Sequence, residues 1–198
     1  MIQTFAPYDV KRWVEENKHL YNPPYKTNRV VVDQKEFIVI IVHGPNTRLD
    51  FHIEPADEFF YQVHGNIELH LKPEDGRREV LKIREGEMFL CPGDLAHSPR
   101  RPENTWGLVI ERKRRSDEKE MFVWFCEMCD AQVLSRTVVQ GDIATQVIRG
   151  LQRRSNHAHL QGLWLHLSTH AYGGAAGFSG EVSLTRGVHE DKCKWPCR

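Results

Sequence analysis

Two side chains that could bind a metal ion lie in residues 51–61, which read FHIEPADEFFY. His52 and Glu58 are six residues apart, so on one straight strand they would share a face but lie roughly 20 Å apart, too far for one ion. Pro55 between them disfavours a continuous central strand. A tight bend at this proline would place His52 and Glu58 on neighbouring strands, pointing the same way. The segment therefore predicts two metal ligands that meet across a turn.

A third candidate ligand, His97, lies in residues 86–99, which read GEMFLCPGDLAHSP. The spacing of Gly86, Pro92 and His97 predicts a strand, a turn and a returning strand. Such a return could bring the imidazole of His97 back towards the first two ligands.

The two segments resemble the two sequence motifs of the cupin superfamily, with Glu54 at the position of the usual second histidine of the first motif. The resemblance implies an all-β fold, the cupin double-stranded β-helix or jelly-roll barrel. It also implies a metal site formed by His52, Glu58 and His97. Two histidines and one carboxylate form the facial triad that is typical of non-haem Fe(II) enzymes that activate O2.

Three further charged residues are predicted beside the candidate metal ligands. Arg48 lies four residues before His52, and Arg101 lies four residues after His97, so strand alternation places each arginine on its histidine's face. Glu111 ends a predicted strand, GLVIE. A guanidinium group is the preferred partner of a carboxylate. A pocket with Fe(II), two arginines and another glutamate suits an anionic aromatic substrate that chelates the metal.

Residues 1–130 as a whole closely resemble the bacterial-type 3-hydroxyanthranilate 3,4-dioxygenase family, through segments that include GPNTRLDFH, DEFFYQ, GEMFLCP, HSPRRPE and WFCEMC. The implied reaction is cleavage of the ring of 3-hydroxyanthranilate by O2, which gives 2-amino-3-carboxymuconate semialdehyde. The resemblance places this reaction in tryptophan degradation by the kynurenine pathway and in quinolinate and NAD biosynthesis. It further suggests a homodimer, and the odd count and close pairing of the five cysteines fit the reduced thiols of a cytoplasmic protein.

The same resemblance assigns a role to each candidate residue. It implies that the two histidines and Glu58 bind Fe(II) and that Arg101 holds the substrate carboxylate. Arg48 would lie beside bound O2, Glu111 would take the hydroxyl proton, and Asn28 would cover the substrate. Two alternatives stay open, a metal-dependent cupin isomerase or decarboxylase and a cupin that binds a small molecule without catalysis. The intact set of two arginines and Glu111 favours the dioxygenase, because a binding module does not need it.

The five cysteines suggest a second metal site. Cys126 and Cys129 have the Cys-x2-Cys spacing that forms half of a tetrahedral site for iron or zinc. In the resembled enzymes a second Cys-x2-Cys pair near the C-terminus completes it. The remaining candidates here are Cys193 and Cys197, whose spacing and position depart from that pattern, so their part in such a site stays open.

Composition and patterning predict the organisation of the chain. It has 198 residues, is 40% hydrophobic, and balances 27 basic against 27 acidic residues, so nothing global indicates nucleic acid or a membrane surface. A helix is predicted over residues 8–20, then short strands with a hairpin turn at 64–66 and a turn at 73–76. The run 111–120 is predicted to be a solvated loop in which only its first residue functions, and the aromatic residues 59–61 are predicted to pack in the core. We expect a cupin catalytic domain over residues 1–120, a Cys-x2-Cys appendage over 121–150 and an irregular tail over 151–198.

Overall fold

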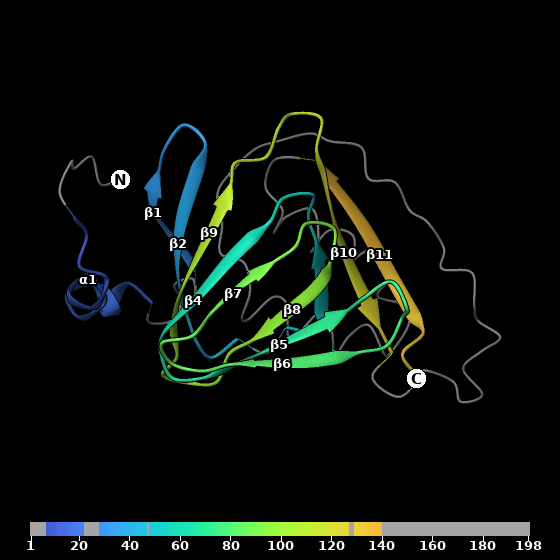
Figure 1. Ribbon diagram of the computed structural model, residues 1–198, viewed down its shortest axis with the longest axis horizontal. Coiled ribbons are helices and arrows are strands. Elements are labelled where there is room, and N and C mark those ends of the chain that lie inside the picture. The colour runs from blue at the N-terminus through green and yellow to red at the C-terminus, as the bar shows by residue number, and fades with distance from the viewer. Residues whose placement is uncertain (1–6, 22–27, 47, 127–128, 140–198) are drawn as a thin grey trace.

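The computed structural model describes residues 7–21, 28–46, 48–126 and 129–139 (Figure 1). These residues form two antiparallel sheets that face each other. The five-stranded sheet has the order β1 (Asn28–Asp33), β2 (Phe37–His43), β9 (Trp106–Arg112), β4 (Glu58–His64) and β7 (Met88–Cys91). The six-stranded sheet has the order β11 (Gln132–Val139), β10 (Lys119–Phe125), β3 (Asp50–Ile53), β8 (Ala96–Arg100), β5 (Ile67–Lys72) and β6 (Glu79–Ile83). The chain passes repeatedly from one sheet to the other, and this confirms the predicted jelly-roll barrel.

Alternation along the strands decides which side chains enter the space between the sheets. In β4, Glu58, Phe60 and Gln62 are buried, whereas Phe59 and Tyr61 between them are only partly buried. Successive strand residues point to opposite faces, so the buried series faces inward. Apolar residues of both sheets then form one core, which contains Val42, Phe60, Ile67, Leu69, Leu71, Ile83, Cys91 and Val109. Of the three aromatic residues predicted for the core, only Phe60 joins this cluster.

The N-terminal helix α1 (Val10–Asn17) and the 3₁₀ turn η1 (Lys18–Tyr21) lie beside β1 and β2 (Figure 1). Asp9 caps the helix, because its carboxylate accepts a hydrogen bond from the backbone nitrogen of Arg12 at 3.0 Å. Val14 and Tyr21 pack with Val31 and Ile41 in a second apolar cluster. The predicted helix is confirmed, although its last turn is a 3₁₀ helix. No helix in the described part of the chain is long and apolar enough to span a bilayer.

Two local predictions are wrong because the chain passes from one sheet to the other between the strands concerned. The predicted hairpin at residues 64–66 is a connection between β4 and β5, which lie in different sheets. Likewise β3 and β4, on either side of Pro55, are not neighbours in one sheet but lie in opposite sheets. By contrast, the turn at 73–76 does join a hairpin, since β5 and β6 pair in antiparallel register.

The division expected at residue 120 falls inside β10. This strand pairs with β3 on one side and with β11 on the other, so it continues the six-stranded sheet. Residues 140–150 of the predicted appendage and all of the predicted tail 151–198 lie outside the described residues.

Candidate metal and substrate site

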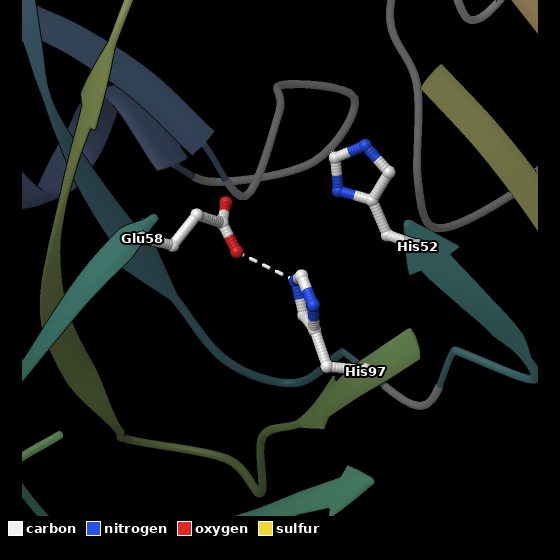
Figure 2. Close-up of side chains that lie close together, drawn as sticks. All are labelled: His52, Glu58 and His97. Atoms are coloured by element: carbon white, nitrogen blue, oxygen red, sulfur yellow. Dashed lines mark ion pairs between the residues drawn. The ribbon is translucent and has the colours of Figure 1, made fainter. Parts of the chain in front are cut away.

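The three predicted metal ligands converge from both sheets onto one point (Figure 2). His52 of β3 and His97 of β8 are paired neighbours in the six-stranded sheet, and Glu58 begins β4 in the facing sheet. One ligand atom from each of the three side chains lies within 4.8 Å of the others, and all three residues are buried. The bend at Pro55 therefore does bring His52 and Glu58 together, but across the barrel.

His97 points its Nε2 atom at the carboxylate of Glu58. Its Nδ1 lies 2.9 Å from the backbone oxygen of Leu95 and donates to it, so the lone pair of the neutral ring is on Nε2. This Nε2 lies 2.5 Å from Oε2 of Glu58. Burial lowers the pKa of His97, but the Glu58 carboxylate outweighs burial and holds that pKa well above its ordinary value. Two acceptors this close need a positive charge between them, and either a proton or a divalent cation supplies it.

A second carboxylate, that of Glu120, orients the ring of His52. Its Nε2 lies 2.8 Å from Oε2 of Glu120, and because a carboxylate only accepts, Nε2 carries the proton and Nδ1 the lone pair. Burial keeps the pKa of His52 below its ordinary value despite the opposing effect of Glu120. The ring also stacks on Phe122, with 4.8 Å between ring centroids and 10° between planes. This carboxylate–histidine pair is the arrangement that orients imidazole ligands in metal sites.

A cavity of about 140 Å³ opens beside these three ligands. Its volume is close to the roughly 150 Å³ of an engineered apolar cavity that holds one benzene molecule. Its apolar wall includes Ile40, Val42, Phe60, Val109 and Phe122. The other four candidate residues, Asn28, Arg48, Arg101 and Glu111, also line it. The structure thus places every residue predicted for iron, substrate or O2 around one space of the size of an aromatic ring.

Arg48 and Arg101 differ in their surroundings. Arg48 forms an ion pair with the buried Asp50, and its guanidinium carbon lies 5.9 Å from the ring centroid of Phe122. Arg101 is 2% exposed and donates from Nη1 to the side-chain oxygen of Gln62 at 3.1 Å. Within the described residues Arg101 has no ion-pair partner, and burial lowers its pKa to about 10. A buried cation without a counter-charge is costly, so this position favours an anionic ligand.

Residues 113–118 form the loop between β9 and β10 that the charge pattern predicts, with 115–117 exposed, but Arg114 and Glu120 of the run 111–120 face inward. Arg114 has a side chain only 17% exposed, and it forms ion pairs with Glu54 at 2.6 Å, with Glu111 at 3.2 Å and with Glu120. Glu120 in turn holds His52. Glu54 therefore faces an arginine, whereas the position in the cupin motif usually carries a metal-binding histidine. We name Arg114 and its three carboxylate partners the Arg114 cluster.

Burial raises the pKa of two carboxyl groups in the Arg114 cluster. For Glu111, burial and the nearby Glu58 carboxylate raise the pKa to about 7, and Arg114 opposes them. For Glu54, burial followed by Glu58 and Glu111 raises the pKa to about 9, again against Arg114. Sequence reasoning missed Arg114 and Glu120. The even spacing of Glu120 from the apolar residues Phe122 and Trp124 of β10 was the one available indication that Glu120 could face inward.

The first cysteine pair lies at the turn between β10 and β11. Cys126 is buried and Cys129 is exposed. The backbone nitrogen of Cys126 donates to the oxygen of Ala131 at 2.8 Å, and the nitrogen of Asp130 donates to the oxygen of Cys126 at 2.9 Å. Asp130 also pairs with Lys72 of β5 and with Arg78, which ties this residue to the six-stranded sheet. Cys193 and Cys197 lie outside the described residues, and the second metal site stays a prediction.

Comparison with known proteins identifies the family. The family model described as 3-hydroxyanthranilic acid dioxygenase matches residues 1–153. The chain belongs to this family. A relative from Bacillus cereus named 3-hydroxyanthranilate 3,4-dioxygenase is 45% identical over 147 residues, which are 74% of this chain and 82% of the relative. A relative of the same name from Neurospora crassa is 39% identical over 142 residues, 72% of this chain and 77% of the relative.

Among solved structures, a cupin-2 domain protein from Shewanella frigidimarina is similar with a TM-score of 0.42 and 18% identity, over 50% of this chain and 91% of that chain.

The match to the 3-hydroxyanthranilic acid dioxygenase family ends at residue 153, close to residue 150, after which the sequence becomes rich in glycine and histidine. All residues that line the cavity lie within the matched part.

Proposed function

We propose that this protein is an Fe(II)-dependent dioxygenase that opens the ring of 3-hydroxyanthranilate with O2 and forms 2-amino-3-carboxymuconate semialdehyde. The observation that carries the proposal is the single cavity in which the candidate triad, a buried unpaired Arg101 and Glu111 meet. Family membership supports the same reaction. The donor set supports iron, because two imidazoles and one carboxylate leave open positions for a chelating substrate and O2.

His52, Glu58 and His97 would hold the metal ion, and the bound ion would lower the pKa of the substrate hydroxyl and activate O2. Arg101 would bind the carboxylate of the substrate, because its guanidinium lines the cavity without a counter-charge. The apolar wall would hold the ring. Arg48 would stabilise negative charge that develops on the oxygen molecule, and Asn28 at the edge of the cavity would cover the substrate.

Glu111 would accept the proton of the substrate hydroxyl. Its carboxylate lines the cavity, and β9 pairs it directly with Glu58 of β4. Arg114 holds one oxygen of Glu111 at 3.2 Å, which would orient the group for proton transfer. A general base works best when its pKa lies near the working pH, and burial moves the pKa of Glu111 in that direction.

The direct test is anaerobic loading of the purified protein with Fe(II), followed by air and 3-hydroxyanthranilate. We expect the absorbance of the semialdehyde to appear, with one O2 consumed for each substrate. Metal analysis of the same sample would show whether iron is bound once per chain or also at the cysteines. A folded, iron-loaded protein that neither consumes O2 nor forms this product would contradict the proposal.

The pH profile of kcat/KM tests the role of Glu111. Its deprotonated form is the base, so kcat/KM should fall as the pH drops through the pKa of Glu111. A cation held by Glu58 would weaken the effect of that carboxylate on the pKa of Glu111. We therefore expect the acidic limb of the pH profile, where kcat/KM falls, at or below pH 7. Glu111→Gln should lower kcat by about 10²–10⁴-fold, the usual contribution of a general base, and remove this limb. A Glu111→Gln enzyme with an unchanged limb would assign the titration to another group.

The proposal includes three further predictions from the sequence. These are the homodimer, the cytoplasmic location and the second iron or zinc ion at Cys126 and Cys129. The hydrogen bond from Asp130 to Cys126 and the ion pairs of Asp130 with Lys72 and Arg78 support the cysteine site, because they fix the position of Cys126 relative to the sheet.

A further inference from the structure

The orientation of Arg101 depends on one neutral side chain, Gln62. This residue is 1% exposed, and its side-chain oxygen accepts from Nη1 of Arg101 at 3.1 Å. Its own amide nitrogen donates to the backbone oxygen of His64 at 2.8 Å. Since the amide nitrogen is occupied in this way, the side-chain oxygen must face Arg101. Gln62 therefore presents a fixed acceptor to the guanidinium.

The backbone around Gln62 is fixed as well. Its nitrogen donates to the oxygen of Glu87 at 3.0 Å, and its oxygen accepts from the nitrogen of Gly86 at 2.8 Å. These bonds lie beside the register pair of Gln62 with Gly107 across β4 and β9. Gln62 is thus a rigid support rather than a mobile contact.

Gly107 supplies the space that the guanidinium occupies. A Cβ atom at this position would lie 2.8 Å from Nη1 of Arg101 and 2.9 Å from the side-chain oxygen of Gln62. Distances this short exclude a side chain there unless the guanidinium moves. The glycine and the glutamine together define where the guanidinium lies.

The neutrality of the Gln62 side chain matters as much as its position. A glutamate at the same position could also accept from Nη1, but it would form a buried ion pair with Arg101. That pair would satisfy the cation and would repel a second carboxylate. With glutamine, the charge of Arg101 stays available, and its Nε has no hydrogen-bond partner among the described residues. Such an unused donor on a 98%-buried side chain indicates a missing acceptor.

We propose that Gln62 is a specificity-determining positioning residue, which with Gly107 holds the Arg101 guanidinium in place and leaves its charge for the carboxylate of the substrate. This inference rests on the proposed function, because it explains how the same cavity selects a carboxylated aromatic ring. It predicts that Gln62 affects the binding of carboxylated ligands only.

The experiment measures dissociation constants for the Fe(II) enzyme under anaerobic conditions, with 3-hydroxyanthranilate and with 2-aminophenol, the same chelating ring without the carboxylate. Gln62→Glu should raise the dissociation constant of 3-hydroxyanthranilate by about tenfold or more and change that of 2-aminophenol less than about twofold. Gln62→Met, which removes the acceptor without adding charge, should give a smaller loss in the same direction. Gln132→Glu on β11 is the matched control, because this exposed glutamine lies outside the cavity.

Equal losses for both ligands, or wild-type binding of 3-hydroxyanthranilate by Gln62→Glu, would overturn the inference. If the added carboxylate prevents folding, Gly107→Ala tests the same geometry, because displacement of the guanidinium should again weaken only the carboxylated ligand. Turnover in air is measured separately. A wild-type enzyme that binds both ligands without turnover would refute the proposed reaction but would leave the role of Gln62 standing.

Discussion

Glu58→Gln should abolish metal binding and activity while the protein stays folded. An amide oxygen is a poor substitute for the carboxylate that faces His97 at 2.5 Å, because it carries no negative charge to bind the cation. The loss of kcat should far exceed the roughly 10–100-fold that follows removal of a residue that only supports a metal ligand. Metal content by plasma emission spectroscopy and the rate of semialdehyde formation measure the two effects.

Thermal unfolding separates loss of metal from loss of structure in this variant. Ligands that bind only the folded state stabilise it, so Fe(II) should raise the melting temperature of the wild type. It should leave that of Glu58→Gln unchanged. Glu79→Gln is the control, because this exposed glutamate lies on β6 away from the cavity. A Glu58→Gln protein that keeps stoichiometric iron would show that Glu58 is not a ligand.

Arg114→Met should lower the free energy of unfolding by about 3–5 kcal/mol near neutral pH, the cost of leaving buried charges without their partner. Methionine keeps much of the length of the side chain but removes the charge that faces Glu54, Glu111 and Glu120. Urea unfolding measures the difference. Arg77→Met is the matched control, because its side chain is 82% exposed and its ion pair with Asp75 contributes little.

The effect of Arg114→Met should grow with pH. Arg114 lowers the pKa of Glu54 and of Glu111, so its removal raises both folded-state values further above the unfolded value of about 4.3. A carboxyl group with a raised folded-state pKa favours folding at low pH, and this advantage is lost as the pH rises through that pKa. The gap between wild type and variant should therefore stay level from about pH 5 to about pH 7 and widen above it, because Glu111 then ionises in the folded wild type but stays protonated in the variant. A constant gap would mean that Arg114 stabilises the fold through packing.

The sequence was sufficient to predict seven of the residues that line the cavity, the three candidate metal ligands and the four candidate substrate or O2 residues, because most of them are defined locally. His52 and Arg48 are related by strand alternation, as are His97 and Arg101. This alternation holds whichever sheet the strand belongs to. The sheet assignment itself could not be predicted in this way. A short turn such as the one after His64 joins a hairpin in one fold and crosses between sheets in another, and only long-range pairing decides which.

The Arg114 cluster escaped prediction for a different reason. Its members are separated by up to 66 residues, from Glu54 to Glu120, and the two that were missed, Arg114 and Glu120, look like ordinary surface charges beside their sequence neighbours. The run that contains Arg114 has the composition of a solvated loop. Only the return of β10 alongside β3 places Glu120 next to His52 and gives Arg114 three buried carboxylates to neutralise.

The three candidate metal ligands lie far apart in the sequence, so we expect them to bind a metal ion only late in folding. Its ligands span residues 52–97 and come from two sheets, so they cannot meet before most of the barrel has closed. The Cys126 and Cys129 thiols, by contrast, are neighbours along the chain before any tertiary contact forms. We therefore expect a soft metal ion to reach the cysteines of a nascent chain first, whereas the catalytic ion enters a finished protein. Iron supplied during refolding should accordingly give no higher yield of native protein than iron added afterwards.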